Sequence, residues 1–152
     1  MGRYATGVCV VAVPDPAADP DHGPSGMTVN SFVSISLEPM LIAWAIQNSS
    51  SQFARYTKAP AFTVSILAQD QHRLARRYAA RGDSERDLAD FSLSKGGLPV
   101  IAGALGHMEC RRWSLYPAGD HTMIFGEVIG IERGPDASPL GFFGGEFCRI
   151  DH

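Results

Sequence analysis

The amino-acid sequence predicts a mainly β fold, an antiparallel barrel or sandwich with a few helical side pieces. Eight segments have the character of β-strands, whereas only two have the pattern of a helix. These helices are too few and too irregularly placed to cover a doubly wound parallel sheet. The chain has 152 residues, 45% of them hydrophobic, which is enough for one domain over residues 1–152 with a core of its own.

The predicted strands are apolar runs, or segments in which polar and apolar residues alternate. They cover residues 7–13, 28–36, 40–46, 61–67, 105–113, 122–132, 140–143 and 146–150. Gly144 and Gly145 separate the last two strands. A Gly-Gly pair between two strands is a strong signal for a two-residue hairpin loop.

Two short helices are predicted between the strands. The first covers residues 52–57 and follows the segment 48–51, which is rich in residues that favour the N-cap position. The second covers residues 71–81. Asp70 is placed to cap its start, and Gly82 is placed to end it.

Two further segments are predicted to be mostly loops. Residues 14–26 are rich in Pro, Asp and Gly, and residues 83–103 contain the turn signal Gly-Gly-Leu-Pro. The first segment is too short to be a linker between domains, which agrees with a single domain.

Composition and charge exclude several classes of protein. The formal net charge is -3, so we expect no basic surface for nucleic acid or an anionic membrane. The longest apolar runs are too short to cross a bilayer, and the N-terminal residues lack the features of a signal peptide. A cytoplasmic location is therefore expected.

The cysteines and histidines predict neither a disulfide nor a metal site. Cys9, Cys110 and Cys148 are odd in number and form no CxxC motif, so we expect reduced thiols in or near strands. The five histidines show no HxxxH or HxxE spacing.

No hydrolytic or phosphate-binding motif is present, because GxSxG, GxGxxG and GxxxxGK are all missing. Polar residues instead gather in three places. The first group lies along the predicted strand 28–36 and consists of Thr28, Asn30, Ser31, Ser34 and Ser36. Such hydroxyls and amides can bind the edge of a planar heteroaromatic ligand. A solvated strand face explains them equally well, and periodicity alone favours that simpler interpretation.

The second polar group precedes the first predicted helix and contains Ser49, Ser50 and Ser51. Free N–H groups at a helix start, together with serine hydroxyls, can bind a phosphate. A plain N-cap is the simpler interpretation. Two such groups separated by one buried strand nevertheless favour a cofactor that combines an aromatic ring with a phosphate.

The third polar group is Gly119-Asp120-His121, just before a predicted strand. Gly and Asp favour a tight turn, which would leave His121 at a strand edge, where it could bind or orient a ligand. A turn with a partly exposed histidine is the simpler interpretation.

Six sequence blocks in a fixed order resemble the flavin reductase family of split-barrel flavoproteins, the small reductase components of two-component flavin monooxygenases. The blocks are MGRYATGVCVVA, GMTVNSF-x-SISLEP, AFTVSILAQDQ, GLPVIAGALGHMEC, GDHTMIFGEVIGIE and PLGFFGGEF. Together they span nearly the whole chain. The segment 14–26 is longer than is usual in this family.

The resemblance implies a Greek-key split β-barrel similar to FMN-binding proteins, commonly a homodimer. It implies an NAD(P)H:flavin oxidoreductase that reduces FMN or FAD with a hydride from NADH or NADPH. It also implies a partner monooxygenase that receives the reduced flavin. A non-catalytic flavin-binding module and a flavin-dependent ferric reductase stay open as alternatives, whereas the GDH block argues against a pyridoxamine-phosphate-oxidase-like enzyme.

The resemblance also assigns roles to residues. Thr28, Asn30, Ser31, Ser34 and Ser36 match the segment beside the isoalloxazine ring. Ser49, Ser50 and Ser51 match the stretch that holds the flavin phosphate. His121 matches the histidine on the nicotinamide side and is the expected catalytic residue, and Arg77 falls where the family often has a basic residue near the phosphates.

Overall fold

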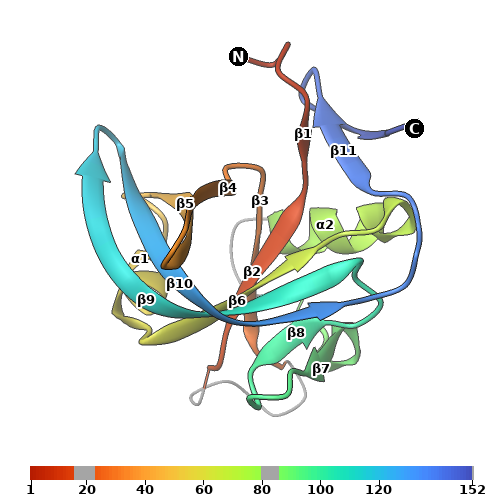
Figure 1. Cartoon of the computed structure of the whole chain (residues 1–152). Helices are drawn as coiled ribbons and strands as arrows, with labels where there is room; N and C mark the ends of the chain where they lie inside the picture. The colour runs from red at the N-terminus through yellow and green to blue at the C-terminus, as the bar shows by residue number, and fades with distance from the viewer. Residues whose placement is uncertain (16–22, 80–85, 152) are drawn as a thin grey trace.

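The largest element of the fold is an antiparallel sheet of seven strands in the order β3-β2-β6-β9-β10-β5-β4 (Figure 1). It is seen in a computed structural model that describes residues 1–15, 23–79 and 86–151. In chain order the strands are β2 (Cys9–Val13), β3 (Ser25–Val29), β4 (Val33–Leu37), β5 (Met40–Gln47), β6 (Ala61–Ile66), β9 (Gly106–Ala118) and β10 (His121–Arg133). The prediction of a mainly β fold with a few helices is confirmed.

The two edge strands of this sheet, β3 and β4, follow each other directly in the sequence. Only residues 30–32 connect them, so the sheet has to curl until its two edges approach each other. No ladder joins the two edges in the described chain, and the barrel is therefore open along this line.

The prediction of one continuous strand over residues 28–36 is wrong because the chain changes partner within it. Val29 pairs with β2, whereas Val33 pairs with β5 on the opposite edge of the sheet. Alternation of polar and apolar residues does not reveal such a change of partner.

Two smaller sheets complete the β structure. The first contains β1 (Thr6–Gly7), β11 (Leu140–Phe143) and β12 (Glu146–Arg149), and the second contains β7 (Phe91–Leu93) and β8 (Pro99–Ile101). The predicted hairpin at Gly144-Gly145 is confirmed, and both glycines have the positive φ that its loop requires. The second sheet and the 3-10 turn η2 (Leu88–Asp90) correct the loop predicted over residues 83–103, of which 83–85 lie outside the described residues.

Three helical segments lie beside the sheet: α1 (Phe53–Lys58), the 3-10 turn η1 (Gln69–Gln71) and α2 (His72–Ala79). They confirm both predicted helices, although residues 80–82 lie outside the described part of the chain. The predicted caps are corrected. Asp70 lies inside η1, where the side-chain oxygen of Gln71 accepts a hydrogen bond from the backbone N–H of Ala68 (2.9 Å). The N-cap of α1 is Gln52 rather than a residue of the segment 48–51.

The long strands β9 and β10 form the curved arm at the left of Figure 1. Both have 13 residues, and β9 runs five residues beyond its predicted end at Trp113. Residues 114–118 have mixed polarity and are all exposed, so no alternation in their sequence predicts a strand. Their pairing with β10 is what extends β9 to Ala118.

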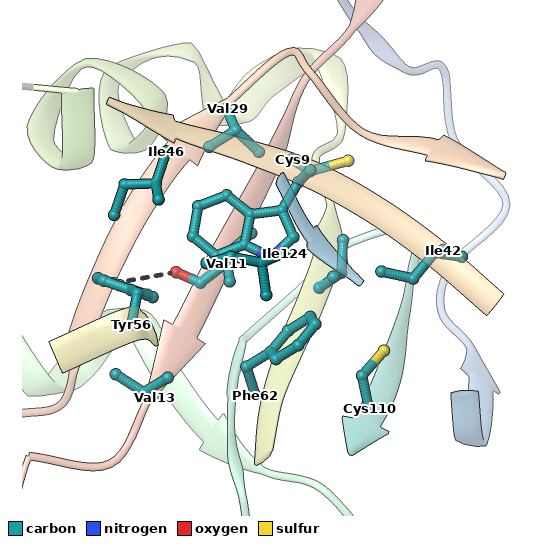
Figure 2. Packing of buried hydrophobic residues seen from close by; sticks show 12 residues of the cluster. Cys9, Val11, Val13, Val29, Ile42, Ile46, Tyr56, Phe62, Cys110 and Ile124 are labelled. Carbon is teal, nitrogen blue, oxygen red and sulfur yellow. Dashed lines mark hydrogen bonds between the residues drawn. The ribbon is translucent and has the colours of Figure 1, made fainter. Parts of the chain in front are cut away.

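The main core lies between the sheet and α1. Trp44 packs edge-on against Tyr56 and Phe62, with ring centroids 5.5 and 6.2 Å apart. Figure 2 shows Cys9, Val11, Phe62 and Ile124 converging on the same core from different strands. A second cluster, which includes Val8, Val10, Leu67, Ala75, Ile101, Ala104 and Leu140, packs beneath α2. The curled sheet thus encloses one core and binds α2 through the other.

The three cysteines are free thiols, as predicted. Burial raises the pKa of Cys9 and of Cys110 to about 12. The described residues contain no group of metal-binding side chains and no helix long and apolar enough to cross a membrane.

Gly126 of β10 faces the core so closely that no side chain fits there. A Cβ atom at this position would lie 2.5 Å from Phe62 Cζ and 3.0 Å from Cys110 Cβ.

We expect Gly126→Ala to lower the free energy of unfolding by about 1–3 kcal/mol, because the Phe62 ring has to move. Urea denaturation measures the change. Gly7→Ala is the control, since nothing lies within 4 Å of its added Cβ, and its effect should stay within about 0.5 kcal/mol. Equal stability of both variants would contradict the close packing.

Candidate functional site

A cavity of about 740 Å³ opens beside the connection between β3 and β4. Its wall is built from the end of β3, the end of β5, the turn that leads into α1, the end of α2 and the start of β10. The lining residues are Met27, Thr28, Val29, Asn30, Ser31, Ala45, Ile46, Gln47, Ser49, Ser50, Ser51, Gln52, Tyr78, Ala79 and His121. The edge strand β3 and the connection that follows it line this cavity, whereas no residue of β4 does.

Seven of the ten residues predicted for the site line this cavity: Thr28, Asn30, Ser31, Ser49, Ser50, Ser51 and His121. Ser34 and Ser36 do not line it. They lie on β4, where they pair with Ile42 and Leu41 across a bulge. The structure therefore brings the three polar groups of the sequence together but leaves the β4 serines away from the wall.

Arg77 also lies outside the cavity wall. Its guanidinium forms an ion pair with Asp90 at 2.5 Å, and the hydroxyl of Tyr78 donates to the same carboxylate at 2.7 Å. The hydrogen bond between the Arg77 guanidinium and the Asp90 carboxylate is the main reason why the pKa of Arg77 lies above its ordinary value. In the structure Arg77 thus ties α2 to η2, which supports the position of Tyr78 on the cavity wall.

Strand pairing brings His121 to the serine-rich turn. His121 pairs with Gln47, the last residue of β5, and Asn48 then bridges the two segments. The Asn48 amide donates to the carbonyl of Gly119 (3.2 Å), and its oxygen accepts from the Thr122 hydroxyl (2.7 Å). The side chain of Asn48 therefore fixes the turn that presents His121.

Two of the predicted hydroxyls make hydrogen bonds that hold the cavity wall together. Thr28 Oγ1 donates to the backbone carbonyl of Ala75 in α2 at 2.6 Å. Ser31 Oγ accepts from the backbone N–H of Ala45 in β5 at 3.0 Å. Part of this polar group therefore holds α2 and the β3–β4 connection in place.

The serine-rich turn keeps two hydroxyls for a ligand. Ser50 Oγ accepts from the backbone N–H of Gln52 (3.2 Å) and so stabilises the turn. In the described part of the chain, the hydroxyls of Ser49 and Ser51 have no hydrogen-bond partner, although both residues line the cavity. Unpaired hydroxyls on a concave wall can donate to a phosphate.

His121 is partly exposed and is oriented by its neighbour. Its Nδ1 lies 2.7 Å from Asp120 Oδ1, so Nε2 is the ring nitrogen that is left for a ligand. The hydrogen bond from His121 lowers the pKa of the Asp120 carboxyl below its ordinary value.

Several lining residues were not predicted from the sequence. Met27, Val29 and Ile46 supply apolar wall, and Gln47, Gln52 and Tyr78 supply polar groups.

No Asp, Glu, Lys or Arg occurs among the described lining residues, so the cavity does not repel an anion. Apolar walls with a few hydroxyl and amide groups suit a flat aromatic ligand that carries a phosphate. The fold and the site thus define a mainly β protein with an open barrel and a cavity for such a ligand.

Comparison with known proteins gives this class its family. The sequence pattern of the flavin reductase like domain matches residues 1–151, and the chain belongs to this family. It is 42% identical to the FMN reductase (NADH) of Agrobacterium fabrum over 99% of this chain and 82% of that protein. It is 34% identical to the reductase component of 4-hydroxyphenylacetate 3-monooxygenase from Thermus thermophilus, over 99% of this chain and 92% of that protein.

A solved structure supports the same relationship. The NADH:FAD oxidoreductase of Streptomyces globisporus, in complex with NAD and FAD fragments, superposes with a TM-score of 0.88. The two sequences are 39% identical, and the match covers 99% of this chain and 88% of that one.

The contact between His121 and Asp120 can be checked by titration. In a His121→Ala variant we expect the pKa of the Asp120 carboxyl to rise towards its ordinary value of 3.8, because its main stabilising hydrogen bond is lost. Carbon-detected NMR of the side-chain carboxyl measures this shift. Because the folded pKa is depressed, the contact stabilises the fold above pH 3.8 and is lost as the pH falls through the folded pKa. An unchanged Asp120 titration in the variant would rule the contact out.

Proposed function

We propose that this protein is an NAD(P)H-dependent flavin reductase that reduces FMN or FAD in the cavity beside the β3–β4 connection. One observation carries the proposal: three polar segments, distant in sequence, line one neutral cavity in a chain that belongs to the flavin reductase family. The named relatives reduce FMN or FAD with NADH.

The proposed position of the flavin follows from the chemistry of the cavity wall. Asn30 and Ser31 stand beside the ring, and the unpaired hydroxyls of Ser49 and Ser51 bind the phosphate. Met27 and Val29 supply apolar surface. When bound, the flavin supplies the hydride-accepting chemistry, so the protein needs no acid–base pair of its own.

His121 is the proposed catalytic residue on the nicotinamide side. Its Nδ1 is held by Asp120, which leaves Nε2 for the nicotinamide nucleotide. The role of this side chain is to hold the nicotinamide close to the flavin ring and in the orientation that hydride transfer requires. Positioning of this kind can lower a barrier by several kcal/mol, roughly 7–11 at best.

A monooxygenase component is the proposed receiver of the reduced flavin. Relatives of this chain are reductase components of monooxygenases, among them the proteins from Thermus thermophilus and from Rhodococcus jostii.

We also propose a homodimer. Six large apolar side chains are exposed on two strands of the large sheet, β4 and β9: Val33, Ile35, Leu37, Trp113, Leu115 and Tyr116. Exposed apolar side chains that lie together are typical of a surface that is covered by a partner. A second copy covers them symmetrically, in keeping with the homodimers common in the family.

The primary test is the oxidation of NADH and NADPH in the presence of FMN or FAD, followed by nicotinamide absorbance. We expect flavin-dependent turnover, and we expect His121→Ala to lower kcat/KM for the nicotinamide at least tenfold while the flavin Kd changes less than threefold. Flavin binding without turnover would leave only the flavin-binding module. Turnover that needs added ferric ions would favour the ferric reductase.

The dimer is tested by light scattering after size-exclusion chromatography. We expect the unmodified chain to elute with twice its monomer mass and Trp113→Glu to shift the population to monomer, because a charge in an apolar interface is costly. Leu93→Glu is the matched control, since Leu93 is also an exposed apolar residue but lies on β7 in another sheet. A monomeric unmodified chain would refute the dimer.

A further inference from the structure

Gln52 is a cavity-lining residue whose side-chain amide is held in one orientation. Its Oε1 accepts a hydrogen bond from Ser25 Oγ at 2.6 Å and a second one from Arg55 Nη1 at 3.3 Å. With two donors on the oxygen, the amide nitrogen must point to the other side. Among the described residues, no acceptor binds Nε2, so this nitrogen is left for a ligand in the cavity.

The hydrogen bonds that hold Gln52 reach into the protein core. Ser25 is fully buried, and its hydroxyl lies 3.0 Å from that of Tyr56, which is also buried. The Tyr56 hydroxyl in turn donates to the backbone carbonyl of Val11 in β2 (3.3 Å), the bond drawn in Figure 2. A side chain anchored in this way loses little further freedom when it binds a ligand.

Capping of the helix does not account for the orientation of the Gln52 amide. Gln52 occupies the N-cap position of α1, but its side chain makes no capping hydrogen bond there. The turn before α1 is stabilised by Ser50 instead. The orientation of the Gln52 amide is therefore set by Ser25 and Arg55 rather than by capping of the helix.

The surroundings of Nε2 define the chemistry of that ligand. Gln52 comes directly after the serine-rich turn, in which the hydroxyls of Ser49 and Ser51 are unpaired in the described chain. These two hydroxyls and the Gln52 amide are therefore three neutral donors on one part of the wall. Arg55 adds a positive charge nearby, and Asp15 at 3.2 Å partly balances it. Hydroxyl and amide donors beside a guanidinium suit an oxyanion such as a phosphate ester.

We propose that Gln52 is a specificity residue that distinguishes phosphorylated flavins, FMN and FAD, from riboflavin. The amide donates to the phosphate next to the ribityl chain, and Ser25 is the positioning residue that aims it. This inference rests on the proposed function, because it takes the ligand of the cavity to be a flavin.

The test compares the Kd values of FMN and riboflavin, measured by flavin fluorescence, in the full chain and in two variants. Gln52→Met removes the donor at nearly constant length and adds no charge, and we expect it to weaken FMN about tenfold while riboflavin changes less than twofold. Ser25→Ala releases the amide without removing it, so a smaller loss, about threefold, should again affect FMN alone.

Gln69→Met is the matched control, since Gln69 is a partly buried glutamine of η1 that lies outside this cavity. It should leave both Kd values unchanged. Unchanged riboflavin binding also shows that each variant is folded. Parallel weakening of FMN and riboflavin by Gln52→Met, or no weakening at all, would overturn the role of Gln52 while the proposed function stands. An unmodified chain that binds neither flavin would overturn both.

Discussion

The hydrogen bond from the Ala45 N–H to Ser31 Oγ, at 3.0 Å, holds the point where the chain crosses from one edge of the large sheet to the other. Only three residues connect β3 to β4, so the sheet has to curl around its core, and its edges meet without pairing. The space beside this crossing is the cavity. Curvature, core and ligand site therefore share one constraint, namely a connection too short to let the sheet stay flat.

Much of this fold could be predicted from the sequence, because apolar runs and turn residues are local signals. The strand over 61–67 and the Gly144-Gly145 hairpin are examples that the structure confirms. The division of 28–36 into two strands could not be predicted in this way. Which partner a residue pairs with is decided by the whole sheet, and both halves of this segment have the same alternation.

The candidate site divides in the same manner. Hydroxyl-rich segments and the turn before His121 can be recognised from residue type, and the structure brings them to one cavity. Gln52 and Tyr78 carry no such signal, because each resembles an ordinary residue of a short helix. Their positions on the wall depend on long-range contacts, such as the hydrogen bond from Ser25 and the bond from Tyr78 to Asp90. The flavin reductase family supplies the chemistry for which this arrangement is suited.

The buried cysteines have a consequence for a protein that handles reduced flavin. Free reduced flavin reacts with dioxygen and yields hydrogen peroxide, which oxidises thiolates far faster than thiols. Burial raises the pKa of Cys9 and of Cys110 to about 12, so both stay in the thiol form at pH 7. Burial thereby protects two sulfur atoms of the core from the oxidant that reduced flavin generates, whereas Cys148 is only partly buried.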